Sequence, residues 1–144
     1  MTNDILVSPF IMTEHTHRLL RQWMNAHCVD ETEIDNLPKL GLMVSHCNTP
    51  VGVAFLRHVE GNKGMIDGFL TDPECELDIR TACLDQLILE LIELAHKNEM
   101  TGIFGLTINK RVVKRALRLG FQLMDHKLVS LNFNCSTWNN LNDG

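Results

Sequence analysis

Asp67 is the residue of this sequence best placed for acid–base chemistry. It lies between Ile66 and Gly68, in a short apolar run that predicts a strand. A carboxylate at a half-buried position is suited to take a proton from a reacting amine. The alternative is a carboxylate at a strand edge or turn, with no catalytic role. His58 and Glu60, on the preceding predicted strand, are further candidate bases.

The other reactive side chains do not form a recognisable set. Two His-Cys pairs, His27-Cys28 and His46-Cys47, lack the spacing of a tetrahedral zinc site, so the sequence predicts no metal site. Cys83 lies near the start of a predicted helix, where the pKa of a thiol can be lowered, but no His or Asp partner can be placed beside it. The cysteines are odd in number and irregularly spaced, which is typical of reduced thiols: Cys28, Cys47, Cys75, Cys83 and Cys135.

The elements that would position these residues are clearest between Gly102 and Phe121. Residues 103–108 are a short, mostly apolar run, which predicts a buried strand. Asn109 can cap the next helix by accepting a hydrogen bond from a backbone N–H near residue 112. Gly120 can take the left-handed conformation that ends that helix. The helix has a basic surface, made by Lys110, Arg111, Lys114, Arg115 and Arg118, and an apolar one, made by Val112, Val113, Ala116, Leu117 and Leu119.

The rest of the chain predicts one α+β domain over residues 1–133, followed by a polar tail at 134–144. Short turns between apolar runs predict three antiparallel strands in hairpin order. A broad apolar stripe predicts the longest helix, roughly Asp78 to Asn98. In chain order we expect a strand at 4–12, a helix capped by Thr13, a loop or short helix at 29–38, strands at Leu40–Cys47, Val51–Glu60 and Gly64–Thr71, the long helix, the stretch 102–121, and one or two strands within 121–133.

Composition excludes several classes of function. The net charge of −5 argues against a general nucleic-acid binder, which would normally be basic. No apolar run approaches the ~20 residues of a membrane-spanning helix. The first residues lack a positively charged region followed by an apolar core, so no signal peptide is evident. With the reduced cysteines, these observations predict a cytoplasmic protein without a nucleic-acid or membrane partner.

Three motifs, in order along the chain, resemble those of the GNAT N-acetyltransferase superfamily, over roughly residues 5–133. That family often has Asn, a small residue three positions later, Tyr four later and Gly-Phe four later; here the positions are Asn109, Val112, Ala116 and Gly120-Phe121. The fourth predicted strand ends in Leu70-Thr71-Asp72-Pro73, similar to the family's apolar-x-x-Pro. The long helix carries Leu87-Ile88, Leu91-Ile92 and Ala95 at the family's spacing.

The resemblance implies a three-layer fold with a mixed, mostly antiparallel sheet whose fourth and fifth strands splay apart. It further implies that acetyl-CoA is the co-substrate, held in the gap by the strand-four backbone at Phe69, Leu70 and Thr71. The pyrophosphate would lie at the start of the long helix, where free N–H groups and the helix dipole bind anions. The residues expected there are Arg80, Thr81, Ala82, Cys83 and Leu84, with Asn109 beside the thioester. The acceptor would be a small-molecule or protein amine, and such domains commonly form homodimers.

The sequence departs from the family pattern at three places. No glycine occurs between Gly68 and Gly102, although the family's phosphate loop normally contains glycine. The helix stripe aligns Ala82 and Leu84 with the glycine positions, whereas alignment on Arg80 would put Cys83 and Asp85 there. The helix entrance is crowded by Asp72, Glu74, Glu76 and Asp78, which either stabilise the helix start or repel a phosphate. Ala116 replaces the Tyr that serves the family as general acid, and the chain has no Tyr.

Two functions therefore follow from the sequence. The first is an acyl-CoA-dependent N-acyltransferase that transfers an acyl group, in the simplest case acetyl, directly to an amine. The second is a GNAT-fold protein that has lost catalysis and serves as a binding or structural module. A variant of the first takes the acyl group from an acyl-carrier protein, docked on the basic helix at Arg111, Lys114 and Arg115.

Overall fold

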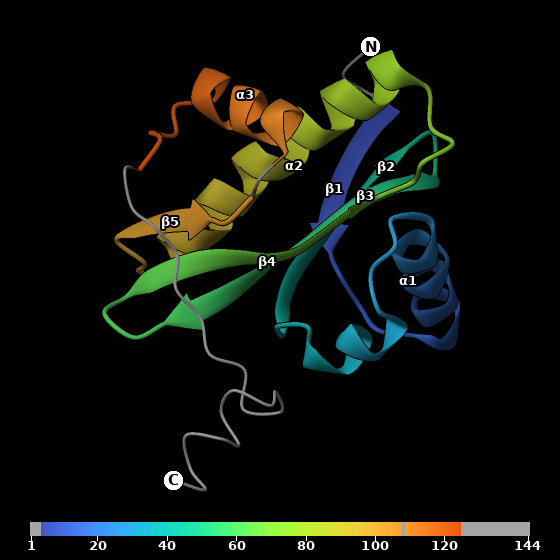
Figure 1. Ribbon diagram of the computed structural model, residues 1–144, viewed down its shortest axis with the longest axis horizontal. Coiled ribbons are helices and arrows are strands. Elements are labelled where there is room, and N and C mark those ends of the chain that lie inside the picture. The colour runs from blue at the N-terminus through green and yellow to red at the C-terminus, as the bar shows by residue number, and fades with distance from the viewer. Residues whose placement is uncertain (1–3, 108, 125–144) are drawn as a thin grey trace, which may run out of the picture.

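A five-stranded sheet with helices on both faces makes up the fold (Figure 1). The computed structural model describes residues 4–107 and 109–124. The strands lie side by side in chain order: β1 (Ile5–Pro9), β2 (Leu40–His46), β3 (Thr49–Val59), β4 (Lys63–Thr71) and β5 (Gly102–Gly105). Neighbours from β1 to β4 are antiparallel, and β5 joins β4 in the parallel direction. The predicted mixed, mostly antiparallel sheet is therefore confirmed.

The helices divide between the two faces of the sheet. On one face lie α1 (Glu14–Ala26) and a short 3-10 helix, η2 (Glu31–Asn36), which settles the alternative left open for residues 29–38. The other face is covered by α2 (Leu77–Lys97), with α3 (Lys110–Arg118) beside it (Figure 1). Thr13 caps α1 as predicted: its hydroxyl accepts from the Thr16 N–H, and the Thr16 hydroxyl accepts from the Thr13 N–H. No helix in the described ranges has the length and hydropathy needed to cross a membrane.

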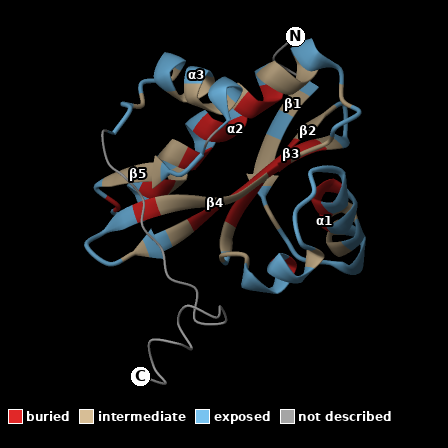
Figure 2. Cartoon of the chain, in the orientation of Figure 1, coloured by how far each residue is buried: buried red, intermediate tan, exposed pale blue. Residues whose placement is uncertain are grey.

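β3 separates two hydrophobic clusters, one on each face of the sheet (Figure 2). Successive side chains of a strand point to opposite faces, so Val53 and Phe55 meet α1 while Ala54 and Leu56 meet α2. All four are at most 1% exposed. A strand covered on both sides needs apolar residues at every position, which explains the unbroken apolar run in this part of the sequence.

Two predicted strands are shorter in the structure than in the sequence analysis. β1 ends at Pro9, and Ile11 is 69% exposed in the connection to α1. β5 was expected to be a buried strand over 103–108, but it ends at Gly105 and is half-buried, and Leu106 is 62% exposed. The reason is that β5 pairs only with the first half of β4. The strands predicted around residues 125–133 and the tail at 134–144 lie outside the described residues.

Candidate active site

The pairing between β4 and β5 stops halfway along β4. Lys63 to Ile66 pair with Gly102 to Gly105, whereas β4 continues to Thr71. On its other side β4 still pairs with β3, and the Asp72 N–H donates to the Val51 carbonyl (2.8 Å). Because backbone groups alternate in direction along an antiparallel strand, the N–H and C=O groups of Phe69 and Thr71 point to the free edge, and those of Leu70 point to β3. The splay implied by the resemblance is therefore present.

A β-bulge in β4 controls which side chains face α1. Leu56 pairs with Ile66 and Ala54 pairs with Phe69, so Asp67 and Gly68 together lie opposite Phe55. The extra residue places Asp67 and Leu70 on the same face of the sheet, although their odd spacing would otherwise put them on opposite faces. Gly68 has φ +93°, and a Cβ there would lie 2.7 Å from Leu37 Cδ2. Only glycine fits this position without strain.

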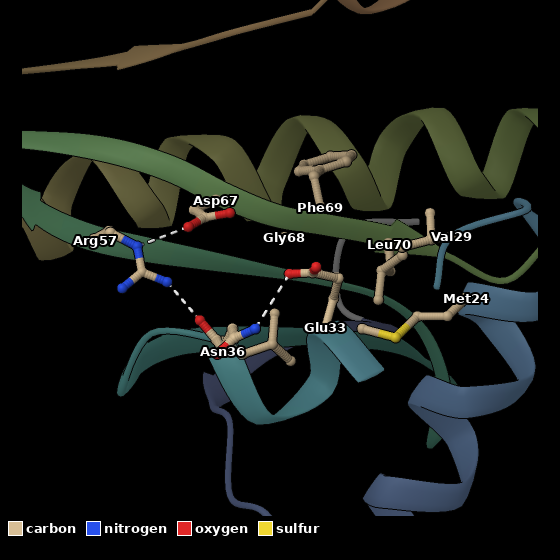
Figure 3. A pocket seen from close by; sticks show the side chains of 10 residues that line it. Met24, Val29, Glu33, Asn36, Arg57, Asp67, Gly68, Phe69 and Leu70 are labelled. Atoms are coloured by element: carbon tan, nitrogen blue, oxygen red, sulfur yellow. Dashed lines mark hydrogen bonds and ion pairs between the residues drawn. The ribbon is translucent and has the colours of Figure 1, made fainter. Parts of the chain in front are cut away.

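A pocket of about 260 Å³ opens beside the bulge, between β4 and the segment from α1 to η2 (Figure 3). Its wall combines apolar side chains with a smaller set of charged and amide groups, which is the usual composition of a small-molecule site. The apolar side chains are those of Met24, Val29, Leu37 and Leu70, and the polar ones those of Glu33, Asn36, Arg57 and Asp67. Phe69 also lines the pocket, but its ring packs against the cluster on the α2 face (Figure 3).

Asp67, the predicted base, is held by an ion pair in this pocket. Its Oδ2 accepts from Arg57 Nε at 2.7 Å, and Arg57 also donates to the Asn36 carbonyl (Figure 3). Asn36 Nδ2 in turn lies 3.5 Å from Glu33 Oε2. Both members of the pair are about 40% exposed (41% and 39%), so solvent screens it and its contribution to stability is about 0–1 kcal/mol. Asp67 therefore lines the pocket with one oxygen committed to Arg57, and its role as a base stays a prediction. His58 and Glu60 are exposed and do not line it.

His27 contacts the free edge of β4, a contact that the sequence did not reveal. Its Nε2 lies 2.9 Å from the Thr71 carbonyl oxygen and 3.3 Å from Thr71 Oγ1. Because a carbonyl oxygen can only accept, Nε2 carries the proton in the first of these bonds. His27 directly follows α1, so this bond ties the end of that helix to the strand edge. One of the acceptors expected to meet the co-substrate is thus engaged by a side chain.

The expected phosphate-binding residues, Arg80 to Leu84, lie inside α2. The helix begins at Leu77, and the Arg80 N–H already donates to the Glu76 carbonyl (2.9 Å). The first amides of a helix are the ones without intrahelical partners, which here are those of residues 77–79. Cys83 and Leu84 are buried against the sheet. The amides suited to an anion therefore lie a few positions before the expected residues, because the helix starts earlier than a loop at 80–84 would require.

Cys83 does not have the properties of a nucleophile. It is fully buried (0% exposed), and burial raises the pKa of its thiol. The lowered pKa considered from its position near the helix start is therefore wrong, because its side chain faces the core and not the helix entrance.

The acids at the entrance of α2 differ in their roles. Asp72 organises the turn before the helix: its Oδ1 accepts from the Glu74 N–H (2.9 Å), and its carbonyl accepts from the Cys75 N–H (3.4 Å). Glu74, Glu76 and Asp78 are exposed, and Glu76 stands at the N-cap without a side-chain hydrogen bond to the helix. Both interpretations of these acids, stabilising the helix or repelling a phosphate, stay open for the three exposed ones.

Asp85 joins α2 to α3 and has no place in a phosphate loop. Its two oxygens accept from the Arg118 guanidinium at 2.8 and 2.9 Å, and Arg115 Nε lies 3.4 Å from Oδ1 without hydrogen-bond geometry. Burial lowers the pKa of Arg115, whereas the hydrogen bonds that Arg118 donates to Asp85 raise the pKa of Arg118. Arg115 is thus engaged inside the molecule, and the exposed Arg118 is paired with Asp85. The exposed basic residues of α3 outside this ion pair are Lys110, Arg111 and Lys114.

Asn109 caps α3 as predicted, accepting from the N–H groups of Arg111 (2.9 Å) and Val112 (3.4 Å). Gly120 has the predicted left-handed conformation, with φ +101°. Ala116, at the family's Tyr position, is half-buried and brings no hydroxyl to the site. The proximity of Asn109 to a thioester remains a prediction.

Solved acetyltransferase structures share this architecture. A GNAT-family acetyltransferase from Streptococcus pneumoniae superposes with a TM-score of 0.67 at 12% identity, covering 89% of this chain and 98% of that one. AAC(6')-Iy, bound to a bisubstrate analogue of CoA, gives 0.62 at 18% identity, with 91% and 99% covered. The ribosomal-protein-S18-alanine N-acetyltransferase from Escherichia coli gives 0.63 at 17% identity, with 82% and 77% covered. No protein-family model matches the sequence, and no curated protein sequence matches it either. The fold is therefore that of the GNAT acetyltransferases, at identities that establish the fold alone.

Proposed function

We propose that this protein is an acyl-CoA-dependent N-acyltransferase, in the simplest case an acetyltransferase, that transfers the acyl group directly to an amine. The observation that carries the proposal is the β4 segment from Asp67 to Thr71. One edge of this segment offers unpaired backbone groups at the splay, while its α1 face forms the wall of a pocket. The acyl donor and the amine acceptor would therefore bind on either side of β4.

The donor side relies on backbone groups. Phe69 presents its N–H and C=O groups, and Thr71 its N–H, to the amides of a pantetheine arm, while the Thr71 carbonyl is already bonded to His27. The amides of residues 77–79 are suited to a pyrophosphate. Neither contact depends on a particular side chain. The absence of glycine from the first turn of α2 therefore weakens the donor site without removing its hydrogen-bond donors.

The acceptor side relies on side chains. The apolar wall and the carboxylates of Glu33 and Asp67 fit a primary amine attached to an apolar body, because the carboxylates attract the ammonium form. After the bound ammonium has lost one proton to water, the free amine nitrogen replaces sulfur on the acyl carbon and the CoA thiolate leaves. The second proton lost by nitrogen passes to a carboxylate. Asp67 Oδ1 is suited to that role, since Arg57 holds the other oxygen. A thiolate is a good leaving group, so the reaction can proceed without the missing Tyr.

Calorimetry with acetyl-CoA tests the donor half of the proposal. We expect measurable binding, accompanied by a rise in melting temperature. Glu76→Gln and Asp78→Asn remove exposed acids at the helix entrance and should strengthen binding if those acids repel a phosphate. Glu93→Gln, near the opposite end of α2, removes an exposed acid as the matched charge control and should leave affinity unchanged. No binding at millimolar acetyl-CoA would contradict the proposal and favour the alternative of a GNAT-fold binding module.

Kinetics with a panel of primary amines test the acceptor half. If Asp67 accepts the proton, Asp67→Asn should lower kcat by about 10²–10⁴-fold. Arg57→Gln breaks the same ion pair but keeps the carboxylate, and it should lower kcat far less. Equal losses in the two variants would show that the ion pair, and not the base, is what matters.

A further inference from the structure

A cluster at the start of β1 brings together three side chains that can bind a metal ion. The carboxylate of Asp4, an imidazole nitrogen of His46 and the thiol of Cys47 each provide one atom, and the three atoms lie within 4.8 Å of one another. Asp4 and Cys47 are exposed and His46 is half-buried. The sequence predicts no metal site, because Asp4 is far from the His-Cys pair along the chain.

The backbone explains why these side chains converge. In the antiparallel pair of β1 and β2, Ile5 lies opposite His46, so the first residue of β1 is beside the last residue of β2. The Cys47 N–H donates to the Asp4 carbonyl (3.0 Å), which extends the pairing by one more step. Cys47 itself has φ +50° in the turn between β2 and β3. The left-handed turn breaks the alternation of the strand, so the Cys47 side chain can lie beside that of His46.

The chemistry and spacing of these groups fit zinc. Thiolate, imidazole and carboxylate are the three side-chain ligands that zinc takes in proteins. Cys47 Sγ lies 3.8 Å from His46 Nε2. A zinc ion with ordinary bonds of about 2.3 Å to sulfur and about 2.0 Å to nitrogen can bridge two atoms at this separation without a change in backbone. Three protein ligands at an exposed position leave a fourth place for water.

The second His-Cys pair of the chain provides an internal comparison. Cys28, like Cys47, follows a histidine, is exposed and has a left-handed backbone, with φ +58°. His27, however, directs Nε2 to Thr71, and within the described part of the chain no carboxylate converges with it to complete a set of three. The two pairs therefore have similar sequence and backbone but differ in the third ligand.

We propose that Asp4, His46 and Cys47 form a binding site for one zinc ion, which fastens the start of β1 to the turn between β2 and β3. This site lies outside the pocket and the splay, and it does not depend on the proposed transferase activity. Binding replaces the thiol proton of Cys47 by the metal, so about one proton is released per ion at neutral pH.

Titration of the full-length, chelator-treated and reduced protein with Co²⁺ tests the site, because a cobalt–thiolate bond has an intense near-ultraviolet charge-transfer absorption. We expect one equivalent of Co²⁺ to produce this band and Zn²⁺ to displace it. Cys47→Ser should abolish the band, while Asp4→Asn and His46→Gln should each weaken Zn²⁺ binding by at least about tenfold in calorimetry, since they remove direct ligands.

Cys28→Ser is the matched control and should leave both the band and the affinity unchanged. Circular dichroism and the melting temperature of each metal-free variant separate loss of a ligand from loss of the fold. A band that persists in Cys47→Ser, a band lost in Cys28→Ser, or the absence of one-to-one binding at micromolar metal would each overturn the proposal.

Discussion

The two sides of the β4–β5 opening present different kinds of chemical group: side chains on the α1 side and backbone groups on the α2 side. On the α1 side, the pocket is formed by side chains that are connected through hydrogen bonds, from Glu33 through Asn36 and Arg57 to Asp67. On the α2 side, the groups available to a donor are backbone amides and carbonyls at the edge of β4 and in the first turn of α2. Substitutions can therefore remove groups of the α1 side directly, whereas the backbone groups of the α2 side remain whatever the side chain.

This difference separates the features that this chain shares with the GNAT fold from those that it lacks. The splay and the helix start are properties of the backbone that many side chains can satisfy, and the bulge requires a particular residue only at Gly68. The Tyr and the phosphate-loop glycines of the GNAT pattern depend on residue type, and this sequence has other residues at those positions. The fold is consequently easier to recognise here than the activity.

The largest expected effect is at the bulge, which both sides share. Gly68→Ala should destabilise the protein by about 2–4 kcal/mol, from backbone strain and from the contact of the new Cβ with Leu37. For a chain of this size, we expect the melting temperature to fall by about 2–4 °C per kcal/mol. Calorimetric melting measures both quantities.

Gly61→Ala separates strain from collision in this prediction. Gly61 has the same φ of +93° as Gly68, but no atom of the described residues lies within 4 Å of a Cβ placed there. It should cost about 1 kcal/mol, from strain alone. Equal costs at the two glycines would show that Leu37 gives way freely and that the pocket wall is not tightly packed.

The next effect concerns how the two outer helices are held. α1 buries Leu20, Trp23 and Met24, whereas α3 has no fully buried residue and is joined to α2 through Asp85. Asp85→Asn should cost about 1–3 kcal/mol, because it leaves the partly buried Arg115 without its counter-charge. Hydrogen exchange should become faster across residues 110–118 and stay unchanged in α1.

Two controls sharpen that comparison. Glu90→Gln alters an exposed acid on the same helix that accepts from Gln86, and it should leave exchange in α3 unchanged. Salt near 1 M should also speed hydrogen exchange in α3 more than in α1, because it reduces the Debye screening length to about 3 Å and so weakens ion pairs. An equal increase in exchange rate in both helices would contradict the inference that ion pairs hold α3 and apolar packing holds α1.

A smaller effect is expected at the cap of α3. Asn109→Ala removes the oxygen that accepts from the amides of Arg111 and Val112, at a cost of about 1 kcal/mol. Asn109→Asp keeps an acceptor and should restore stability to within a few tenths of a kcal/mol. Urea denaturation measures both variants. If Asn109→Ala also lowers acetyl-CoA affinity while Asn109→Asp does not, the cap matters to the donor site through α3.

The features that could be predicted from the sequence are those determined by residues close together along the chain. Asn109, Gly120, Thr13 and the hairpin turns act within a few residues, and their roles were readable from local spacing. The contacts of His27 with Thr71 and of Asp85 with Arg118 join positions 44 and 33 residues apart, and no local pattern encodes them. Asp67 was recognised as a candidate because its neighbours predict a strand. Its partner Arg57 was missed, because the pairing depends on the register of β3 and β4 and on the bulge.

The smallest expected effect is on the α1 side, at the exposed ion pair of Arg21 and Glu31, whose atoms are 2.9 Å apart. The hydrogen bond from Arg21 lowers the pKa of Glu31. A lowered pKa in the folded state means that the stabilisation is complete above the pKa of the unfolded chain and is lost as the pH falls through the folded value. Glu31→Gln should therefore flatten the loss of stability below about pH 4. Arg21→Gln should flatten it as well, and the double variant should add nothing further when urea midpoints are compared across pH. Additive effects of the two substitutions would show that the pair is not coupled in solution.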